Sequence, residues 1–243
     1  MRDAAGGAAA GEGAGATSGV LTAIAAEFAA CTRCADLGVP PDERRAAFSR
    51  LAAAYRPERV RVLFVAESPP QRNRRGRWTH FYLPEERPPG EDPSMLFWAM
   101  ADVLALAESC GTTLAEAKRD RPAWKPRLLS EFRRRGLFLV DAAKCAVNGV
   151  RDDGARGSAV TRCAETWLTR ELRVLEPDRV VLIKVTVHDL LEPILVRAGF
   201  GARLERERIP HPGSGQYANF QHAMRQVVGR RPTLFAPPEL GRP

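Results

Sequence analysis

The chain has 243 residues, a length that fits one sizeable α/β domain. Lys and Arg outnumber Asp and Glu by 37 to 29, giving a formal net charge of +8, which favours a polyanionic partner. General solubility of an arginine-rich chain is the competing explanation of this charge. Because no run of 18 apolar residues and no signal-peptide pattern occur, we expect a cytoplasmic monomer without membrane association.

Composition also divides the chain into three parts. Residues 1–18 are mostly Ala and Gly and hold too few large apolar groups to offset the entropy of ordering. We therefore predict a disordered lead-in over residues 1–18, a single domain over residues 19–229, and a loose Pro-rich tail over residues 230–243.

Along the chain, hydrophobic patterns with a helical period alternate with short continuous apolar runs. Helices are predicted over residues 20–35, 42–55, 93–109, 127–135, 159–175, 186–198 and 216–228. Buried strands are predicted over residues 60–66, 137–140, 179–183 and 202–208. This alternation predicts an α/β fold, a single three-layer αβα domain with a central, mostly parallel four-stranded sheet.

Polar side chains follow each predicted strand. Glu67, Asp141, Lys184 and His211 come just after the four apolar runs. Because ligands of open parallel sheets bind beyond the carboxyl ends of the strands, we expect these four side chains at one rim. The loop over residues 67–92 is long for a structureless connection, and such loops are usually functional.

The five cysteines divide into a set of four and a single one. Cys31 and Cys34 form a C-x2-C pair, and Cys145 and Cys163 form a more distant pair. In a cytoplasmic protein thiols stay reduced, so this spacing suggests four ligands of a zinc ion or of a four-iron cluster. Spacing alone does not separate the two, and four buried free cysteines are the third alternative. Cys110 lies alone on an apolar helix, where we expect it to pack in the core.

Taken in order, these motifs resemble the iron-sulfur, thermostable type of uracil-DNA glycosylase, often called family four. That family has a C-x2-C pair, a first-strand motif GE-x-PG, a Phe, a strand ending in N-x2-K-C, a fourth cysteine and a late His-Pro. The chain has CTRC from Cys31, AESPP from Ala66, Phe81, DAAKC from Asp141, then Cys163 and HPGS from His211. The resemblance covers about residues 30–228 and marks a divergent member of that superfamily.

The resemblance implies a DNA glycosylase of base excision repair, which flips a damaged base out of DNA and hydrolyses its glycosidic bond. It implies a 4Fe-4S cluster held by Cys31, Cys34, Cys145 and Cys163, with zinc as the alternative occupant. Glu67 would orient water or stabilise the sugar cation, and His211 would donate to the departing base. Further substrate contacts would come from Ala66, Ser68, Phe81, Asp141, Lys184 and Ser214.

The resemblance also suggests how DNA is held. The arginines of the long loop would neutralise phosphates, and Tyr217 would wedge into the gap left by the extruded base. These arginines are Arg72, Arg74, Arg75 and Arg77. A merely solvated basic loop is the competing interpretation.

Two departures from the family pattern bear on the substrate. Asp141 stands where an Asn reads uracil, and an ionised carboxylate only accepts hydrogen bonds, so it favours a base with an exocyclic amine. Burial would raise the pKa of Asp141 and restore a donor. Lys184 stands where relatives tend to have Gly, and it could bind phosphate, attack the sugar, or extend along the surface.

Three of the site residues also have a purely structural interpretation. Glu67 could be a solvated loop carboxylate, His211 could satisfy the start of the last helix, and Phe81 could pack under the loop. Two other functions also fit the sequence: a DNA-binding relative with altered catalysis, and an iron-sulfur protein that senses redox state on the same fold.

Overall fold

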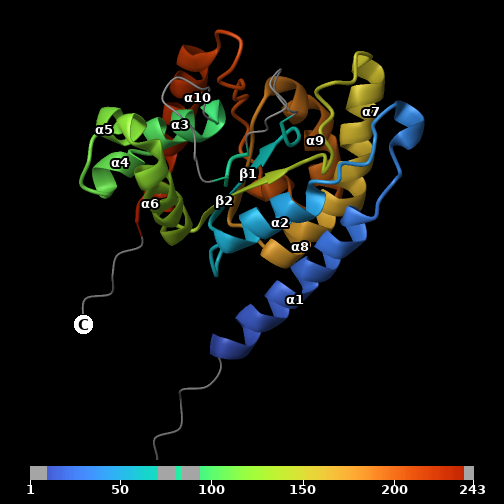
Figure 1. Cartoon of the computed structure of the whole chain (residues 1–243), viewed down its shortest axis with the longest axis horizontal. Helices are drawn as coiled ribbons and strands as arrows, with labels where there is room; N and C mark the ends of the chain where they lie inside the picture. Colours follow the sequence, from blue (N-terminus) through green and yellow to red (C-terminus); the bar gives the residue numbers. More distant parts are fainter. Residues whose placement is uncertain (1–9, 71–79, 84–93, 238–243) are drawn as a thin grey trace, which may run out of the picture.

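A computed structural model describes residues 10–70, 80–83 and 94–237, with side chains described from residue 19 onward. Three parallel strands form its sheet in the order β2-β1-β3 (Figure 1). They are β1 (Val62–Ala66), β2 (Leu137–Asp141) and β3 (Arg179–Leu182). All three lie where the apolar runs predict them, and the α/β class with a parallel sheet is confirmed.

The central strand explains why a continuous apolar run is needed. β1 pairs with β2 on one edge and β3 on the other, and all five of its residues are buried. A strand covered on both faces has no polar side, so its sequence does not alternate. The register pairs Ala66 with Asp141 and Val65 with Leu182, so the three strands end at nearly the same level.

The prediction of a fourth strand is wrong. Residues 201–203 form a short 3-10 helix, and the segment after them makes two isolated bridges, Val180 to Leu204 within β3 and Ile183 to Ile209 just after β3. Between these bridges the segment carries Glu205 and Glu207, whose carboxylates both pair with Arg230. The ion pairs tie the intervening residues to the last long helix instead of to a continuous ladder.

Helices lie on both sides of the strands in Figure 1. One group holds α3 (Met95–Val103), α4 (Leu106–Ser109), α5 (Leu114–Arg119), α6 (Arg121–Arg134), α10 (Tyr217–Arg230) and α11 (Pro232–Phe235). The other holds α1 (Ala10–Ala29), α2 (Arg45–Ala54), α7 (Asp153–Cys163), α8 (Thr169–Leu175) and α9 (Val185–Arg197). A five-residue π turn, Ala164–Leu168, joins α7 to α8.

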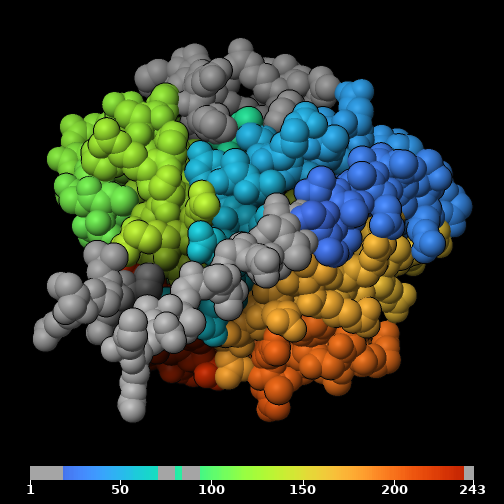
Figure 2. Space-filling model, turned by 90° about the horizontal axis from the view of Figure 1, so that it is seen from below, coloured from blue at the N-terminus to red at the C-terminus, as the bar shows by residue number. Residues whose placement is uncertain are grey.

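The ends of the chain contain more helix than the composition suggests. α1 begins at Ala10, within the segment predicted to be disordered, and α11 lies within the predicted tail. α1 packs against α8, and Figure 2 shows the blue N-terminal segment beside the gold one. Within the described ranges, no helix combines the length and apolar character needed to span a bilayer.

Candidate active site and cysteine cavity

A cleft of about 670 Å³ opens at the carboxyl ends of the three strands. This volume is typical of pockets that hold a small molecule or a single base. Every residue that the sequence assigns to catalysis or substrate contact lines this cleft: Ala66, Glu67, Ser68, Phe81, Asp141, Lys184, His211 and Ser214. The expectation that the strand ends meet at one rim is therefore confirmed.

Backbone hydrogen bonds beyond the strands hold these residues side by side. The N–H of Ala143 donates to the carbonyl of Glu67 at 2.9 Å, which continues the pairing of β1 with β2. On the other edge, the N–H of Lys184 donates to the carbonyl of Ile209 at 2.8 Å, two residues before His211. The sheet thus places the three loops that carry the polar side chains next to one another.

Glu67 is held by two cations within the cleft. Its Oε2 lies 2.6 Å from Nζ of Lys184, and its Oε1 lies 3.9 Å from Nε of Arg156. The Glu67 side chain is only 11% exposed, which excludes the alternative that it is a solvated loop carboxylate. A carboxylate fixed in this way presents a directed negative charge to whatever occupies the cleft.

Lys184 reaches Glu67 from a strained backbone. Its φ is +87°, in the region that favours glycine, and it directly precedes α9. A side chain in this region costs on the order of 1–3 kcal/mol, and such residues cluster at functional sites. The lysine therefore points into the cleft instead of extending along the surface, and the small Gly expected of relatives would suit this backbone without strain.

His211 is fixed in one tautomer. Its Nδ1 accepts a hydrogen bond from the N–H of Gly213 at 3.1 Å, which leaves the proton on Nε2. A Cβ on residue 213 would lie 3.1 Å from this nitrogen, so glycine lets the turn close onto the ring. Burial and then the charge of Lys184 lower the pKa of His211, while Glu67 opposes the shift. At neutral pH the ring is an uncharged donor.

Asp141 lies at the end of β2. Burial raises its pKa to about 7, with Lys144 lowering it and Glu171 raising it further. A carboxyl group with this pKa is partly protonated at neutral pH and can then donate as well as accept. Burial thus restores part of the hydrogen-bonding pattern that an amide would supply.

We expect the substitution Asp141→Asn to change how stability depends on pH. Between about pH 4 and about pH 7 the folded chain keeps a proton on Asp141 that the unfolded chain has released. The free energy of unfolding of the wild type should therefore fall, relative to Asp141→Asn, as pH rises through this window. Urea unfolding at several pH values measures the difference, and a difference independent of pH would contradict the raised pKa.

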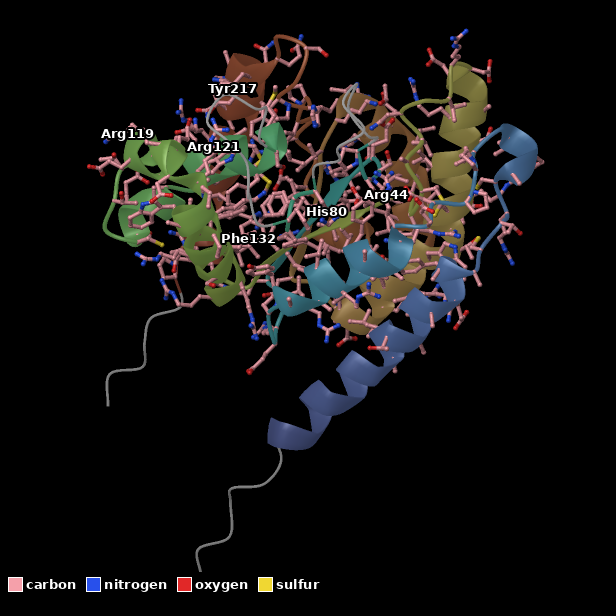
Figure 3. All side chains as sticks on the ribbon, viewed as in Figure 1. Arg44, His80, Arg119, Arg121, Phe132 and Tyr217 are labelled. Atoms are coloured by element: carbon pink, nitrogen blue, oxygen red, sulfur yellow. The ribbon has the colours of Figure 1, made fainter. Side chains whose placement is uncertain are left out.

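The segment over residues 80–83 forms one wall of the cleft. Phe81 lines the cleft but is only 5% exposed, and its ring contacts those of Phe97 and Phe132. His80 stacks on Phe48 at 4.4 Å between ring centroids, and burial lowers its pKa to about 3. Figure 3 shows His80 in the middle of the molecule. Phe81 is thus packed against other aromatic rings of the core, as its purely structural interpretation expects, although it lines the cleft.

Tyr82 anchors this wall to β2. Its buried hydroxyl accepts from the N–H of Leu139 at 2.7 Å and donates to the carbonyl of the same residue at 3.1 Å. One side chain therefore satisfies both main-chain groups of a strand residue. The position of Phe81 and His80 depends on this pair of hydrogen bonds.

We expect Tyr82→Phe to lower the free energy of unfolding by about 1–3 kcal/mol, because the buried N–H and C=O of Leu139 lose their partner. Equilibrium urea unfolding measures this loss. Tyr55→Phe is the matched control, since Tyr55 stacks on Tyr82 but is less buried. Equal stability of the wild type and Tyr82→Phe would contradict the proposed anchor.

Three helices start at the cleft. Ser94, Lys184 and Gln216 line it and directly precede α3, α9 and α10. The N-terminus of a helix carries a partial positive charge, which attracts anions. The cleft therefore combines a net attraction for anionic groups with the single directed carboxylate of Glu67.

The residues predicted to hold DNA are only partly described. Arg72, Arg74, Arg75 and Arg77 lie outside the described residues. Tyr217 is 37% exposed, and its hydroxyl donates to Oδ2 of Asp102 at 2.8 Å. In Figure 3 it lies on α10, at the periphery of the molecule. This hydrogen bond ties the ring to α3, and the prediction that it wedges into DNA stays a prediction.

The four cysteines of the predicted set line one cavity, away from the cleft. Cys31 and Cys34 follow α1, Cys145 follows β2, and Cys163 ends α7. Cys110 lies elsewhere and packs against the main core, as expected. All five are free thiols. The division of the cysteines into four and one is confirmed by their positions.

Hydrogen-bond donors surround this cysteine cavity. The buried guanidinium of Arg45 lies 3.7 Å from Sγ of Cys145, and the N–H of Lys144 donates to Sγ of Cys163 at 3.2 Å. Burial raises the pKa of the Cys163 thiol to about 12 and also raises that of Cys34. Such donors offset the negative charge of metal-bound sulfur, whereas the raised pKa values favour protonated thiols when no metal is bound.

A single metal ion requires its ligands to be placed more exactly than a larger cluster does. Tetrahedral zinc needs its ligands to converge to about 2.3 Å from one point. In the part of the chain that the structure describes, no group of three or more His, Cys, Asp or Glu side chains is placed so that it could hold a metal ion. The cysteines surround a cavity instead, together with the rings of Phe28 and Trp167.

Several polar residues at the cleft are missing from the sequence-based site, and two of them lie after β2. Arg156 of α7 approaches Glu67, and Asn148 lines the cleft from the loop after β2. Both lie between the third and fourth cysteines, a stretch that supplies no residue of the sequence-based site. The signal that could have identified them is their position in the loop and helix after a strand whose end was already assigned to the site.

In comparisons with known proteins, no family model matches this chain and no curated protein matches it.

Proposed function

We propose that the protein is a DNA glycosylase that flips a deaminated or otherwise modified base out of DNA and hydrolyses its N-glycosidic bond. One observation carries the proposal. A largely buried carboxylate, a neutral imidazole, a protonatable acid and an aromatic ring, each from a different part of the chain, line one base-sized cleft. These residues are Glu67, His211, Asp141 and Phe81.

The chemistry of the bond calls for two opposite charges. As the glycosidic bond breaks, positive charge grows on the sugar and negative charge grows on the departing base. Glu67, held by Lys184 and Arg156, would face the sugar and accept a proton from the attacking water. His211 would donate its Nε2 proton in a hydrogen bond to the base, because Gly213 occupies Nδ1.

Base selection would depend on the protonation of Asp141. In its neutral form the carboxyl donates and accepts, as uracil or hypoxanthine requires, and in its ionised form it favours a base with an amine. A pKa of about 7 leaves both forms populated near neutral pH. Uracil is therefore a possible substrate among several deaminated bases.

The cysteine cavity would hold a 4Fe-4S cluster bound by Cys31, Cys34, Cys145 and Cys163. Such a group would tie the segment after α1 to the loop after β2 and to the end of α7. Its contribution would be structural, since the cluster cavity and the cleft have no lining residues in common.

The deciding experiment offers the purified protein oligonucleotides that contain uracil, hypoxanthine, xanthine or an alkylated base, followed by hot alkali. Strand breaks at the modified position, absent with undamaged DNA, are expected for at least one base. Salt-dependent DNA binding without breaks would favour a relative with altered catalysis. A failure to bind DNA at all would favour redox sensing by the cluster.

A further inference from the structure

Lysine is rare in this chain, and its use in the cleft needs an explanation. Only four of the 37 basic residues are lysines: Lys118, Lys125, Lys144 and Lys184. Lys125 and Lys144 are buried, and Lys118 lies on α5. An arginine would pair with a carboxylate at least as well, through two parallel hydrogen bonds. The ion pair with Glu67 therefore does not explain why this position carries a lysine.

What a lysine offers and an arginine does not is a primary amine that can lose its proton and attack carbon. Lys184 is held in the cleft by a strained backbone, with its Nζ 2.6 Å from a carboxylate that can accept that proton. Its side chain is 31% exposed, so a ligand in the cleft can reach the amine. The cleft would receive the sugar whose base has just been released.

We propose that Lys184 is a nucleophile that cleaves the DNA strand at the abasic sugar, which makes the protein a lyase as well as a glycosylase. The inference rests on the proposed function for the placement of the sugar near Glu67. It adds a second reaction at the same cleft, on the aldehyde form of an abasic deoxyribose.

The proposed strand cleavage needs no co-reactant other than water. Lys184 gives a proton to Glu67, and its neutral amine attacks C1′ of the aldehyde. Glu67 returns the proton to the hydroxyl on C1′, which leaves as water, and an iminium bond joins Nζ to C1′. Glu67 then takes a proton from C2′, a C2′–C3′ double bond forms, and the C3′–O bond breaks with its electrons on the departing phosphate. Water finally hydrolyses the iminium bond and frees the lysine and an unsaturated aldehyde.

The test uses the full-length protein and a duplex with a preformed abasic site, so it does not depend on base release. Borohydride reduces an iminium bond to a stable amine and thereby links protein to DNA. We expect a linked species on a denaturing gel with the wild type and with Lys118→Arg, and its loss with Lys184→Arg. Without borohydride, the wild type should cut the strand in the absence of alkali.

Mass spectrometry of the digested adduct keeps the inference testable should Lys184→Arg fail to fold. The modified peptide is expected to contain Lys184. A wild type that gives no adduct, an adduct that persists in folded Lys184→Arg, or a link to another residue would overturn the inference. Alkali-dependent breaks at a modified base, scored in parallel, report on the glycosylase, so the two proposals can fail separately.

Discussion

Removal of the Glu67 charge or of the His211 hydrogen-bond donor is expected to abolish most base release. Glu67→Gln keeps the size of the side chain but removes its negative charge, and His211→Ala removes the imidazole that carries its proton on Nε2. Each should lower the single-turnover rate by about 100- to 10,000-fold, the usual contribution of a general acid or base. Alkali cleavage of the preferred substrate measures this rate.

A matched control lies near the opposite end of the same strand. Glu58 is exposed a few residues before β1, so Glu58→Gln removes the same charge far from the cleft. Its rate should equal that of the wild type. Full activity in folded Glu67→Gln would contradict the assigned role of this carboxylate and, with it, the proposed reaction at this cleft.

Loss of one cysteine of the cavity is expected to remove the bound iron and much of the stability. Cys163→Ser replaces a buried thiol whose sulfur accepts from the N–H of Lys144. Because the four proposed ligands come from three separate segments, the free energy of binding the proposed cluster would contribute to folding. Iron analysis of protein purified without oxygen should fall from about four atoms per chain toward zero, and the melting temperature should fall with it.

Cys110→Ser is the control, because Cys110 packs against the core and not around the cavity. This variant should keep the brown colour and the iron content of the wild type. A colourless wild type that contains zinc would refute the cluster, and a wild type without metal would leave four buried thiols as the correct interpretation.

The sequence predicts those parts of the fold that depend on local patterns. The run VRVLFVA identifies β1 because a strand covered on both faces must be apolar throughout. The same reasoning fails over residues 202–208. Leu204 bridges to β3 and Ile209 bridges to the residue after β3, but the glutamates between them pair with Arg230, which is about 25 positions away. A pattern within seven residues carries no information about that partner.

The candidate site shows the same contrast between what the sequence pattern predicts and what depends on residues distant in the sequence. Topology alone predicts that Glu67, Asp141, Lys184 and His211 share a rim, because parallel strands end together. The ion pair of Lys184 with Glu67 and the neutral tautomer of His211 could not be predicted, and the raised pKa of Asp141 could be predicted only on the condition that this strand end is buried. Each depends on distances and burial that arise only when β1, β2 and β3 are side by side.

The hydroxyl of Tyr82 also affects how copies of the protein behave toward one another. β2 is an outer strand of the sheet, and outer strands tend to recruit strands from other molecules through their free main-chain groups. At Leu139 both of these groups are already occupied by the phenol. The same contact that shapes a wall of the cleft thereby protects this point of the sheet against aggregation.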